Sequence, residues 1–214
     1  SENFYEVGLV GRRIDLLEEL KCELPNPSYI KQIDVSETEK ATLLLKSLFH
    51  EMGHVDVVIL NAGTGFKNTE YSWKTDDKVI GVNVRGFCAL ANVTCQYFSG
   101  QGHGHIVSIS SIASYVFSGT SASYCASKAF VSSYIKGLRR TIKRNKHRID
   151  VTDILPGYVN TSLVKNQPGM FWIASPEKAA IQIFRAIKKK KKKVYVSKRW
   201  ALVAWILKLF SFWH

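Results

Sequence analysis

The sequence predicts an α/β protein in which a doubly wound parallel β-sheet carries helices on both faces. Short apolar runs alternate along the chain with amphipathic segments of helical length, and no internal repeat is present. The runs are apolar throughout, as at residues 55–60, which is typical of parallel strands covered on both faces. A chain of 214 residues suits a single domain, which we expect over residues 1–198, followed by an apolar helix or tail over residues 199–214.

The first part of the chain predicts three strands and two helices. Pro25 and Pro27 end the first helix, and Gly53 ends the second. Ser36, with Glu39 three residues later, forms a predicted capping box at the start of the second helix. We expect strands at residues 5–10, 29–33 and 55–60, and helices at residues 14–24 and from Ser36 to about Met52.

The second part of the chain continues the alternation of strands and helices. A long helix is expected to carry Asn83, and another helix, running to about Asn145, carries Tyr124. Pro176 suits the first turn of a third helix, because proline lacks the amide hydrogen that would be unpaired there. We expect strands at residues 105–110, 149–155 and 194–196, and the third helix at residues 176–187.

Residues that suit a binding site follow the predicted strands at their carboxyl ends. Ligands of doubly wound sheets bind in the crevice at this edge. One such residue at a strand end carries little information, whereas five along one edge define a crevice. The five are Arg12, Asp34, Asn61, Ser111 and Pro156.

Tyr124 and Lys128 carry the clearest chemistry at this edge. Their spacing of four residues places both side chains on one face of a helix. A neighbouring ammonium favours the phenolate, so we expect Lys128 to lower the pKa of Tyr124 and to make the phenol a usable general acid or base. Ser111, at the end of the preceding strand, is placed to hold the substrate oxygen. Taken alone, the Tyr-Lys spacing also fits an ordinary pair on a helix surface.

Five motifs follow one another along the chain: Asn61-Ala62-Gly63, Asn83-Val84-Arg85-Gly86, Ser111, Tyr124-x-x-x-Lys128 and Pro156-Gly157-x-Val159-x-Thr161. In order and spacing they resemble the short-chain dehydrogenase/reductase family, over nearly the whole chain. The resemblance implies a Rossmann-like fold and an oxidoreductase that uses a nicotinamide cofactor.

The resemblance also implies roles for the residues of these motifs. Tyr124 would be the catalytic acid or base, and Ser111 would polarise the substrate carbonyl. Lys128 would lower the pKa of Tyr124 and bind the nicotinamide ribose. Asn83 would support a proton-relay water near Lys128, although it also fits a structural amide inside a helix.

The cofactor would lie along the strand ends. The resemblance implies that Asp34, followed by Val35, contacts the adenine ring and that Thr161 bonds the nicotinamide carboxamide. Asp34 also fits the N-cap region of the next helix, and Thr161 also fits a loop cap. The other implied cofactor contacts are Asn61, Ala62, Gly63, Pro156, Gly157 and Val159, together with Tyr124 and Lys128.

Two arginines favour NADP(H) as the cofactor. Sites that prefer NAD place an acid at the end of the family's second strand, where it bonds the ribose 2′-hydroxyl. Here that place holds Gly11-Arg12-Arg13, and an arginine fork matches a 2′-phosphate. We expect Arg12 to be the first contact and Arg13 the second, with no acid present to repel the phosphate. The alternative is a solvated basic pair after a strand.

The family's first strand and its glycine-rich turn, G-x-x-x-G-x-G, have no counterpart in the sequence. In the family's strand order that first strand is central, so we expect its two neighbours to lack a partner on that side. Unpaired backbone groups are costly to bury. We therefore expect residues upstream of Ser1 to supply the strand and the turn.

The composition limits the partners and the compartment. A net charge of +13 favours anionic partners such as nucleotide phosphate or anionic lipid. No zinc-finger spacing, RNA-recognition signature or helix-turn-helix occurs, so we predict no nucleic acid and no metal site. The four cysteines, at positions 22, 88, 95 and 125, form no CxxC pair, and no signal peptide is visible, which indicates reduced thiols and a cytoplasmic protein.

Six consecutive lysines, residues 188–193, precede an apolar segment that follows Lys198. This segment is too short to span a membrane, and it contains Lys208. Three interpretations stay open: peripheral contact with a membrane interface, a lid or dimer contact, and plain core. Phe171 and Trp172, in the loop after Thr161, favour an apolar substrate.

We therefore expect an NADP(H)-dependent oxidoreductase that interconverts a carbonyl and a secondary alcohol on an apolar or lipid-like substrate. The alternatives are a non-catalytic nucleotide-binding protein and a membrane-peripheral scaffold on the same fold. The resemblance further implies a homodimer or homotetramer that pairs through the helices carrying Asn83 and Tyr124.

Overall fold

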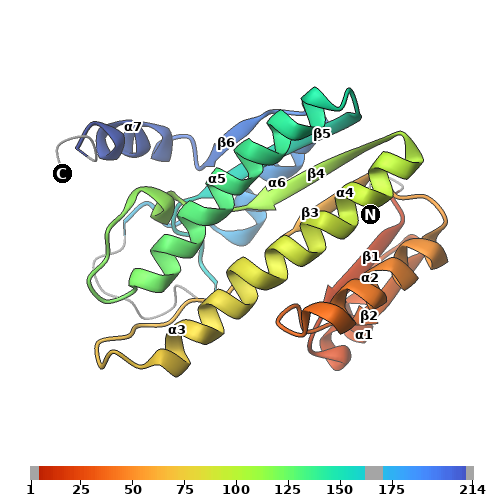
Figure 1. Ribbon diagram of the computed structural model, residues 1–214, viewed down its shortest axis with the longest axis horizontal. Coiled ribbons are helices and arrows are strands. Elements are labelled where there is room, and N and C mark those ends of the chain that lie inside the picture. The colour runs from red at the N-terminus through yellow and green to blue at the C-terminus, as the bar shows by residue number, and fades with distance from the viewer. Residues whose placement is uncertain (1–4, 162–170, 211–214) are drawn as a thin grey trace.

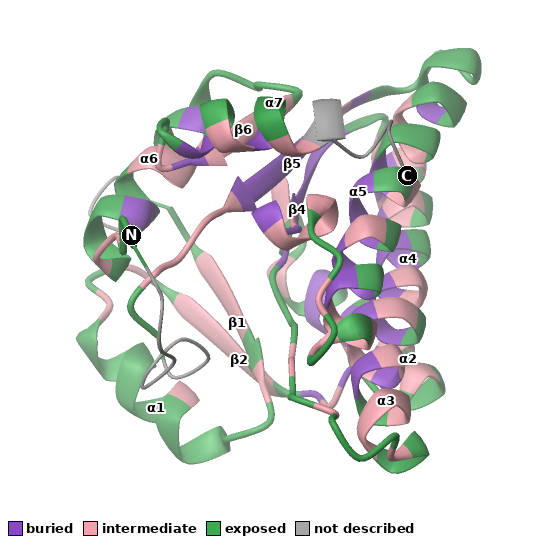
Figure 2. Ribbon diagram, turned by 90° about the vertical axis from the view of Figure 1, so that its left-hand side faces the viewer, coloured by how far each residue is buried: buried purple, intermediate pink, exposed green. Residues whose placement is uncertain are grey.

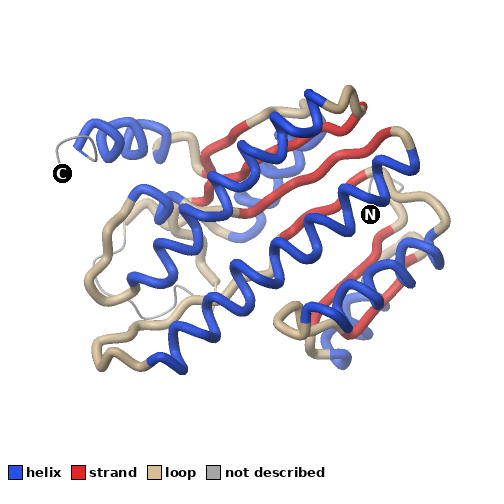
Figure 3. Tube along the Cα trace, in the orientation of Figure 1, coloured by secondary structure: helices blue, strands red, loops and turns tan. Residues whose placement is uncertain are grey.

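The computed structural model describes residues 5–161 and 171–210 and has parallel strands layered between helices (Figure 1). The predicted α/β class is therefore confirmed. Continuous apolar runs became strands because both of their faces are covered, as the tube view shows for the strands between the helices (Figure 3). The strands are β1 (Val7–Gly11), β2 (Ser28–Gln32), β3 (Val57–Leu60), β4 (His103–Ile109), β5 (Arg148–Pro156) and β6 (Lys193–Val196).

The helices form the two outer layers. Helices α2, α4 and α5 lie on one side of the strands, and α1 and α6 lie on the other (Figures 1 and 2). Between α3 and α4 the chain forms a π-helical turn at Gly81–Gly86, and a 3-10 turn at Ile112–Tyr115 precedes α5. The helices are α1 (Ile14–Glu23), α2 (Thr38–Met52), α3 (Trp73–Ile80), α4 (Phe87–Gln101), α5 (Ala122–Arg144), α6 (Pro176–Lys188) and α7 (Trp200–Phe210).

The largest core lies between the strands and the layer of α2, α4 and α5, where buried residues predominate (Figure 2). Phe98, Ile106 and Ile135, from α4, β4 and α5, are fully buried in it. Burial of a side chain of this size stabilises a fold by about 1.5–3 kcal/mol. A smaller core under α6 packs against β5 and β6. The two cores hold β4 and β5 rigidly, and the ends of these strands carry the candidate site.

The strands form two parallel sheets rather than one. β1 pairs with β2, and β3, β4, β5 and β6 pair in that order. Within the described residues, the edges of β1 and β3 that face each other are unpaired, and a cavity of about 850 Å³ lies between them, lined by residues 8–12 and 57–61 among others. The expectation that two strands lack a partner where the family has a central strand is confirmed.

Two local predictions differ from the structure. The capping box is wrong, because α2 begins at Thr38 and the Ser36 hydroxyl instead donates to Asp34 Oδ1 at 2.6 Å. The long helix around Asn83 is interrupted by the π-helical turn. Gly86 closes this turn against the chain at Val35, where an added Cβ would lie 2.4 Å from the Val35 carbonyl oxygen. The predicted end of α2 is correct, since Gly53 has a positive φ of 71°.

Candidate functional site

The candidate site lies at the carboxyl end of β4, beside the first turns of α5. Ser111 has extended backbone angles just past β4, and its hydroxyl accepts a hydrogen bond from the Ala113 amide at 3.1 Å. The same hydroxyl donates to the Pro156 carbonyl at 3.4 Å, which ties it to the end of β5. Ser111 thus lies at the end of β4, where the sequence predicted it, and is also tied to the end of β5.

Tyr124 and Ser111 meet in the structure. Burial raises the pKa of Tyr124, and a hydrogen bond with the Ser111 side chain lowers that pKa by a smaller amount. The predicted lowering of this pKa by Lys128 is not observed, because the desolvation of the phenol outweighs every favourable contact. In this structure Tyr124 is therefore a neutral phenol that can donate a proton.

Lys128 lies one turn further along α5 and is only 6% exposed. Its Nζ donates to the Ile109 carbonyl at 3.0 Å and lies 5.9 Å from the centroid of the Tyr124 ring. Burial lowers the pKa of Lys128 from its ordinary 10.5 to about 8, while the nearby Asp153 carboxylate opposes the shift. At neutral pH the side chain is still mostly charged, so it is a buried cation beside a phenol.

Asp153 is a buried acid beside the candidate site that the sequence patterns did not single out. It is 2% exposed in the middle of β5 and accepts from three serine hydroxyls: Ser110 at 2.6 Å, Ser132 at 2.6 Å and Ser108 at 3.2 Å. Its carboxylate raises the pKa of Lys128 against the effect of burial. An acid in the middle of an apolar strand was the available signal.

Asn83 is 1% exposed in the π-helical turn, and its amide is shared between two other segments. Its Oδ1 accepts from the Thr64 amide, and its Nδ2 donates to the Thr64 carbonyl, each at 2.8 Å. Nδ2 also donates to Ser127 Oγ at 2.9 Å. Both amide hydrogens are therefore engaged, and Asn83 fastens the loop after β3 to α5.

The loop after β3 approaches the candidate catalytic pair through glycines. A Cβ added at Gly63 would lie 3.1 Å from Lys128 Nζ, and one at Gly65 would lie 2.6 Å from the Tyr124 ring. The predicted Asn61-Ala62-Gly63 segment therefore reaches both the candidate catalytic pair and the cavity, which Asn61 and Ala62 help to line. Only a backbone without side chains allows this approach.

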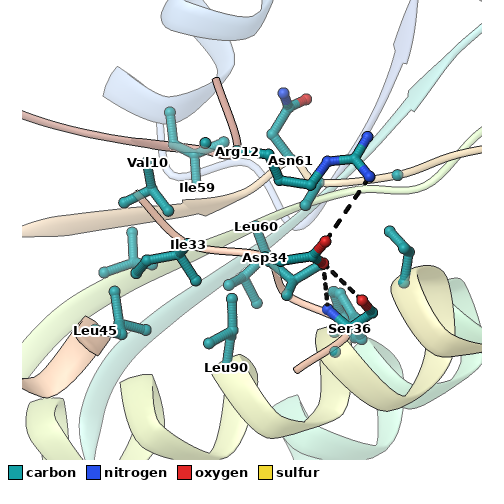
Figure 4. A pocket seen from close by; sticks show the side chains of 18 of the residues that line it. Val10, Arg12, Ile33, Asp34, Ser36, Leu45, Ile59, Leu60, Asn61 and Leu90 are labelled. Carbon is teal, nitrogen blue, oxygen red and sulfur yellow. Dashed lines mark hydrogen bonds and ion pairs between the residues drawn. The ribbon is translucent and has the colours of Figure 1, made fainter. Parts of the chain in front are cut away.

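Arg12 and Asp34 lie together at the polar end of the cavity (Figure 4). Arg12 Nη1 is 3.8 Å from Asp34 Oδ2, and the Arg12 side chain is 70% exposed. Hydrogen bonds from Ser36 lower the pKa of Asp34, with a smaller contribution from the Arg12 charge. The prediction that no acid lies near Arg12 is wrong, because β1 and β2 are parallel neighbours with Gly11 beside Gln32, so Arg12 and Asp34 follow adjacent strand ends.

The other predicted cofactor contacts are spread more widely. Val35 is buried and lines the cavity, whereas Arg13 is exposed at the N-cap of α1. Val159 forms an isolated bridge with Ala174, and Thr161 is exposed at the end of a described segment. The predicted substrate loop lies partly outside the described residues, at 162–170.

Gly157 is covered by an aromatic cluster that begins with Trp200. An added Cβ on Gly157 would lie 2.0 Å from Trp200 Nε1, so the indole packs directly on this glycine. Tyr158 meets the Trp200 ring edge-on at 5.3 Å, and Phe171 stacks on it at 5.3 Å. The nearby Tyr158 raises the pKa of Tyr124 electrostatically, which places the aromatic cluster beside the candidate catalytic tyrosine.

Helix α7 is buried on one side and apolar on its exposed side. Trp200 and Ala204 are buried, whereas Leu202 and Trp205 are 60% and 61% exposed. The interpretation of this segment as part of the protein core therefore applies to only one face of the helix. None of the helices in the described part of the chain is long and apolar enough to cross a bilayer.

The lysine run contacts two different parts of the fold. Lys190 forms an ion pair with Asp150, near the start of β5, at 2.7 Å. Lys193, the last lysine of the run, donates to the Tyr115 hydroxyl and lies over the Tyr195 ring, and both tyrosines pack against the core that holds Trp200 of α7.

Comparisons with known proteins agree with this geometry. The family model described as short chain dehydrogenase matches residues 2–170. An uncharacterized oxidoreductase of Staphylococcus saprophyticus is 32% identical over 76% of this chain and 68% of its own length. An NADP-dependent 3-hydroxy acid dehydrogenase of Escherichia coli is also 32% identical, over 76% of this chain and 66% of its own length.

Solved structures share the fold. The crystal structure of a 3-ketoacyl-ACP reductase from Sinorhizobium meliloti superposes with a TM-score of 0.79 at 23% identity, covering 91% of this chain and 88% of that one. A serine dehydrogenase from Escherichia coli superposes with a TM-score of 0.76 at 25% identity, over 91% and 87%. With its Rossmann-like α/β fold, the chain belongs to the short-chain dehydrogenase family of oxidoreductases.

Proposed function

We propose that the chain is an NADP(H)-dependent oxidoreductase that interconverts a carbonyl and a secondary alcohol, with Tyr124 as the catalytic acid and base. The observation that carries the proposal is the meeting of Ser111 and Tyr124 at the end of β4, with the buried Lys128 in the next turn. Two hydroxyls that converge in one place suit a single substrate oxygen, which accepts a hydrogen bond from each.

The roles of the three residues follow from their surroundings. Neutral Tyr124 donates its proton to the substrate oxygen during reduction, and in the oxidation direction its tyrosinate form accepts the proton of the alcohol. Ser111 is held at the end of β4 by Ala113, and its hydroxyl would turn from the Pro156 carbonyl, a long contact of 3.4 Å, to donate to the same oxygen. The positive charge of Lys128 stabilises the tyrosinate that forms when Tyr124 gives up its proton.

In this proposal Asn83 holds the loop after β3 in place. Its side-chain hydrogens are engaged by Thr64 and Ser127, so the proposed relay water near Lys128 would donate to an oxygen of Asn83 rather than accept from its amide. The amide instead holds Thr64, and with it Gly63 and Gly65, against Lys128 and Tyr124. A loop held in this way keeps the catalytic pair in one arrangement.

A nicotinamide nucleotide fits the residues that are present. The strand ends at the mouth of the cavity carry Arg12, Asp34, Ser36 and Asn61, polar groups that suit the ribose and phosphates of a nucleotide, whereas the apolar space between β1 and β3 is the place of the family's central strand. The nicotinamide would supply the hydride near Tyr124. Lys128 would bind the nicotinamide ribose, and Thr161 the carboxamide.

The choice of NADP(H) rests on Arg12. Solved relatives include complexes with NADP and with NAD, so family membership leaves the choice to local charges. The exposed guanidinium of Arg12 is free to turn from Asp34 toward a 2′-phosphate, because a pair separated by 3.8 Å at the surface is weak. The NADP dependence of the Escherichia coli relative supports the same choice.

An apolar substrate fits the surroundings of Tyr124. Tyr158, Phe171 and Trp200 present aromatic surface next to the catalytic tyrosine. We propose that this surface packs on a lipid-like substrate, and that the exposed face of α7 makes a peripheral membrane contact or a contact in a homodimer or homotetramer.

A non-catalytic nucleotide-binding or scaffold protein is the competing proposal. Such a protein has no reason to keep a charged lysine in a buried position, which lowers stability. The lowered pKa of Lys128 corresponds to about 3 kcal/mol. A residue that costs this much and contacts the candidate tyrosine favours catalysis over scaffolding.

Tyr124→Phe removes the proton that the proposal needs while it keeps the ring. We expect the rate of NADPH oxidation with a panel of ketones and 3-oxoacyl compounds to fall by about 100-fold or more. The matched control is Tyr71→Phe, because Tyr71 is 95% exposed and should leave the rate unchanged. Full activity in the Tyr124 variant would refute the assigned mechanism.

Lys128→Met should stabilise the fold while it abolishes activity. The folded protein binds fewer protons at Lys128 than the unfolded chain does between pH 8 and 10.5, so the penalty is complete below pH 8 and fades as the pH rises toward 10.5. Urea unfolding at pH 7 should show a gain of up to about 3 kcal/mol that shrinks by pH 10. A loss of stability at pH 7 would contradict the electrostatic account.

Arg12→Ala should weaken the binding of NADPH by about 10-fold and leave the binding of NADH unchanged, because only NADPH carries the 2′-phosphate. Asp34→Asn should have the opposite effect on NADPH, since it removes the competing carboxylate. Arg13→Ala is the matched control, with a smaller effect expected. Fluorescence titration measures all of these affinities, and equal losses for both nucleotides would rule out the role of Arg12.

A further inference from the structure

A group of three potential metal ligands lies at the end of the sheet opposite the candidate active site. His54 is in the loop between α2 and β3, Asp56 directly precedes β3, and His103 is the first residue of β4. All three side chains are exposed, and one ligand atom from each lies within 4.8 Å of the other two.

The distances are close to those of a metal site. His54 Nε2 lies 3.2 Å from Asp56 Oδ1, and His103 Nε2 lies 3.9 Å from the same oxygen. Zinc binds imidazole nitrogen and carboxylate oxygen at about 2.0–2.1 Å, so two ligands in a tetrahedral site are about 3.3 Å apart. Small rotations of exposed side chains bring His103 into that range.

The backbone holds these ligands in place. Gly53 and Gly102 end α2 and α4 with positive φ angles of 71° and 89°, which turns His54 and His103 toward the same edge. The Gln101 amide then bonds both segments, since its Nε2 donates to the Val55 carbonyl at 2.8 Å and to the His103 carbonyl at 3.1 Å.

The sheet fixes the third ligand. The His105 amide donates to the Asp56 carbonyl at 2.9 Å, and β3 pairs with β4 directly after this contact. Asp56 and His103 are therefore set by neighbouring parallel strands rather than by a loose loop. A site built on such elements loses little freedom when a metal binds.

We propose that His54, Asp56 and His103 form a binding site for a divalent transition metal such as Zn²⁺, with water in the remaining positions. Two imidazoles and one carboxylate are a donor set that zinc, nickel, cobalt and copper accept, whereas magnesium and calcium prefer oxygen ligands alone. The sequence analysis predicted no metal site, because the three ligands come from two segments about 50 residues apart and share no motif.

The bound metal joins the loop after α2 to the turn after α4. Because it binds the folded arrangement and not the unfolded chain, it stabilises the fold in proportion to its concentration over its dissociation constant. The site lies away from Ser111 and Tyr124, so its role does not depend on the proposed catalytic function.

Titration calorimetry with Zn²⁺ alone tests the proposal. The full chain should carry Cys22→Ser, because Cys22 is an exposed thiol that binds zinc on its own. In this background we expect one site whose affinity falls at least 10-fold in His54→Gln and in His103→Gln. The matched control is His147→Gln, an exposed histidine at another turn, which should bind as the background does.

A second readout separates ligation from misfolding. Zn²⁺ should raise the unfolding temperature of the background protein and of His147→Gln but not of His103→Gln. Co²⁺ should give the visible spectrum of nitrogen and oxygen ligands without a sulfur charge-transfer band. Equal zinc affinity in the background and in a His54→Gln/His103→Gln double variant, or a sulfur band with Co²⁺, would overturn the assignment.

Discussion

The candidate active site depends on the charges buried between α5 and the sheet. Lys128 on α5 and Asp153 on β5 are both less than 10% exposed, and burial of the Lys128 ammonium still costs stability despite the opposite charge of Asp153. The serine hydroxyls around the carboxylate and the Ile109 carbonyl at the ammonium satisfy them locally. The first turns of α5 are thereby fixed against the ends of β4 and β5, which is where Tyr124 meets Ser111.

This arrangement separates the tasks of the two ends of the sheet. The carboxyl ends hold the hydroxyls, the buried cation and the aromatic cluster, and so carry the proposed chemistry. The amino ends carry exposed histidines and an acid on rigid strand starts, away from that chemistry. The polar groups that we propose for the nucleotide, among them Arg12, Asp34 and Asn61, lie at the same carboxyl ends.

Much of the fold could be predicted from the sequence, and so could the grouping of Ser111, Tyr124 and Lys128 at one site. Strands with both faces covered leave continuous apolar runs, and helix ends leave local signals such as Gly53. The order of the motifs around Ser111, Tyr124 and Lys128 indicated the site. Pairwise contacts across the chain left no such signal: Asp153 of β5 accepts from Ser110, just past β4, and the ion pair of Arg12 with Asp34 depends on the pairing of β1 with β2. The pKa of Tyr124 was mispredicted because burial depends on the whole environment, not on spacing.

The most direct test of the account is a crystal structure of the protein with NADPH and an unreactive analogue of a ketone substrate. The account predicts that the analogue's oxygen lies within about 2.6–3.2 Å of both Ser111 Oγ and Tyr124 Oη, with the Lys128 ammonium at the nicotinamide ribose. An analogue that binds elsewhere, or a nicotinamide ring far from Tyr124, would contradict it.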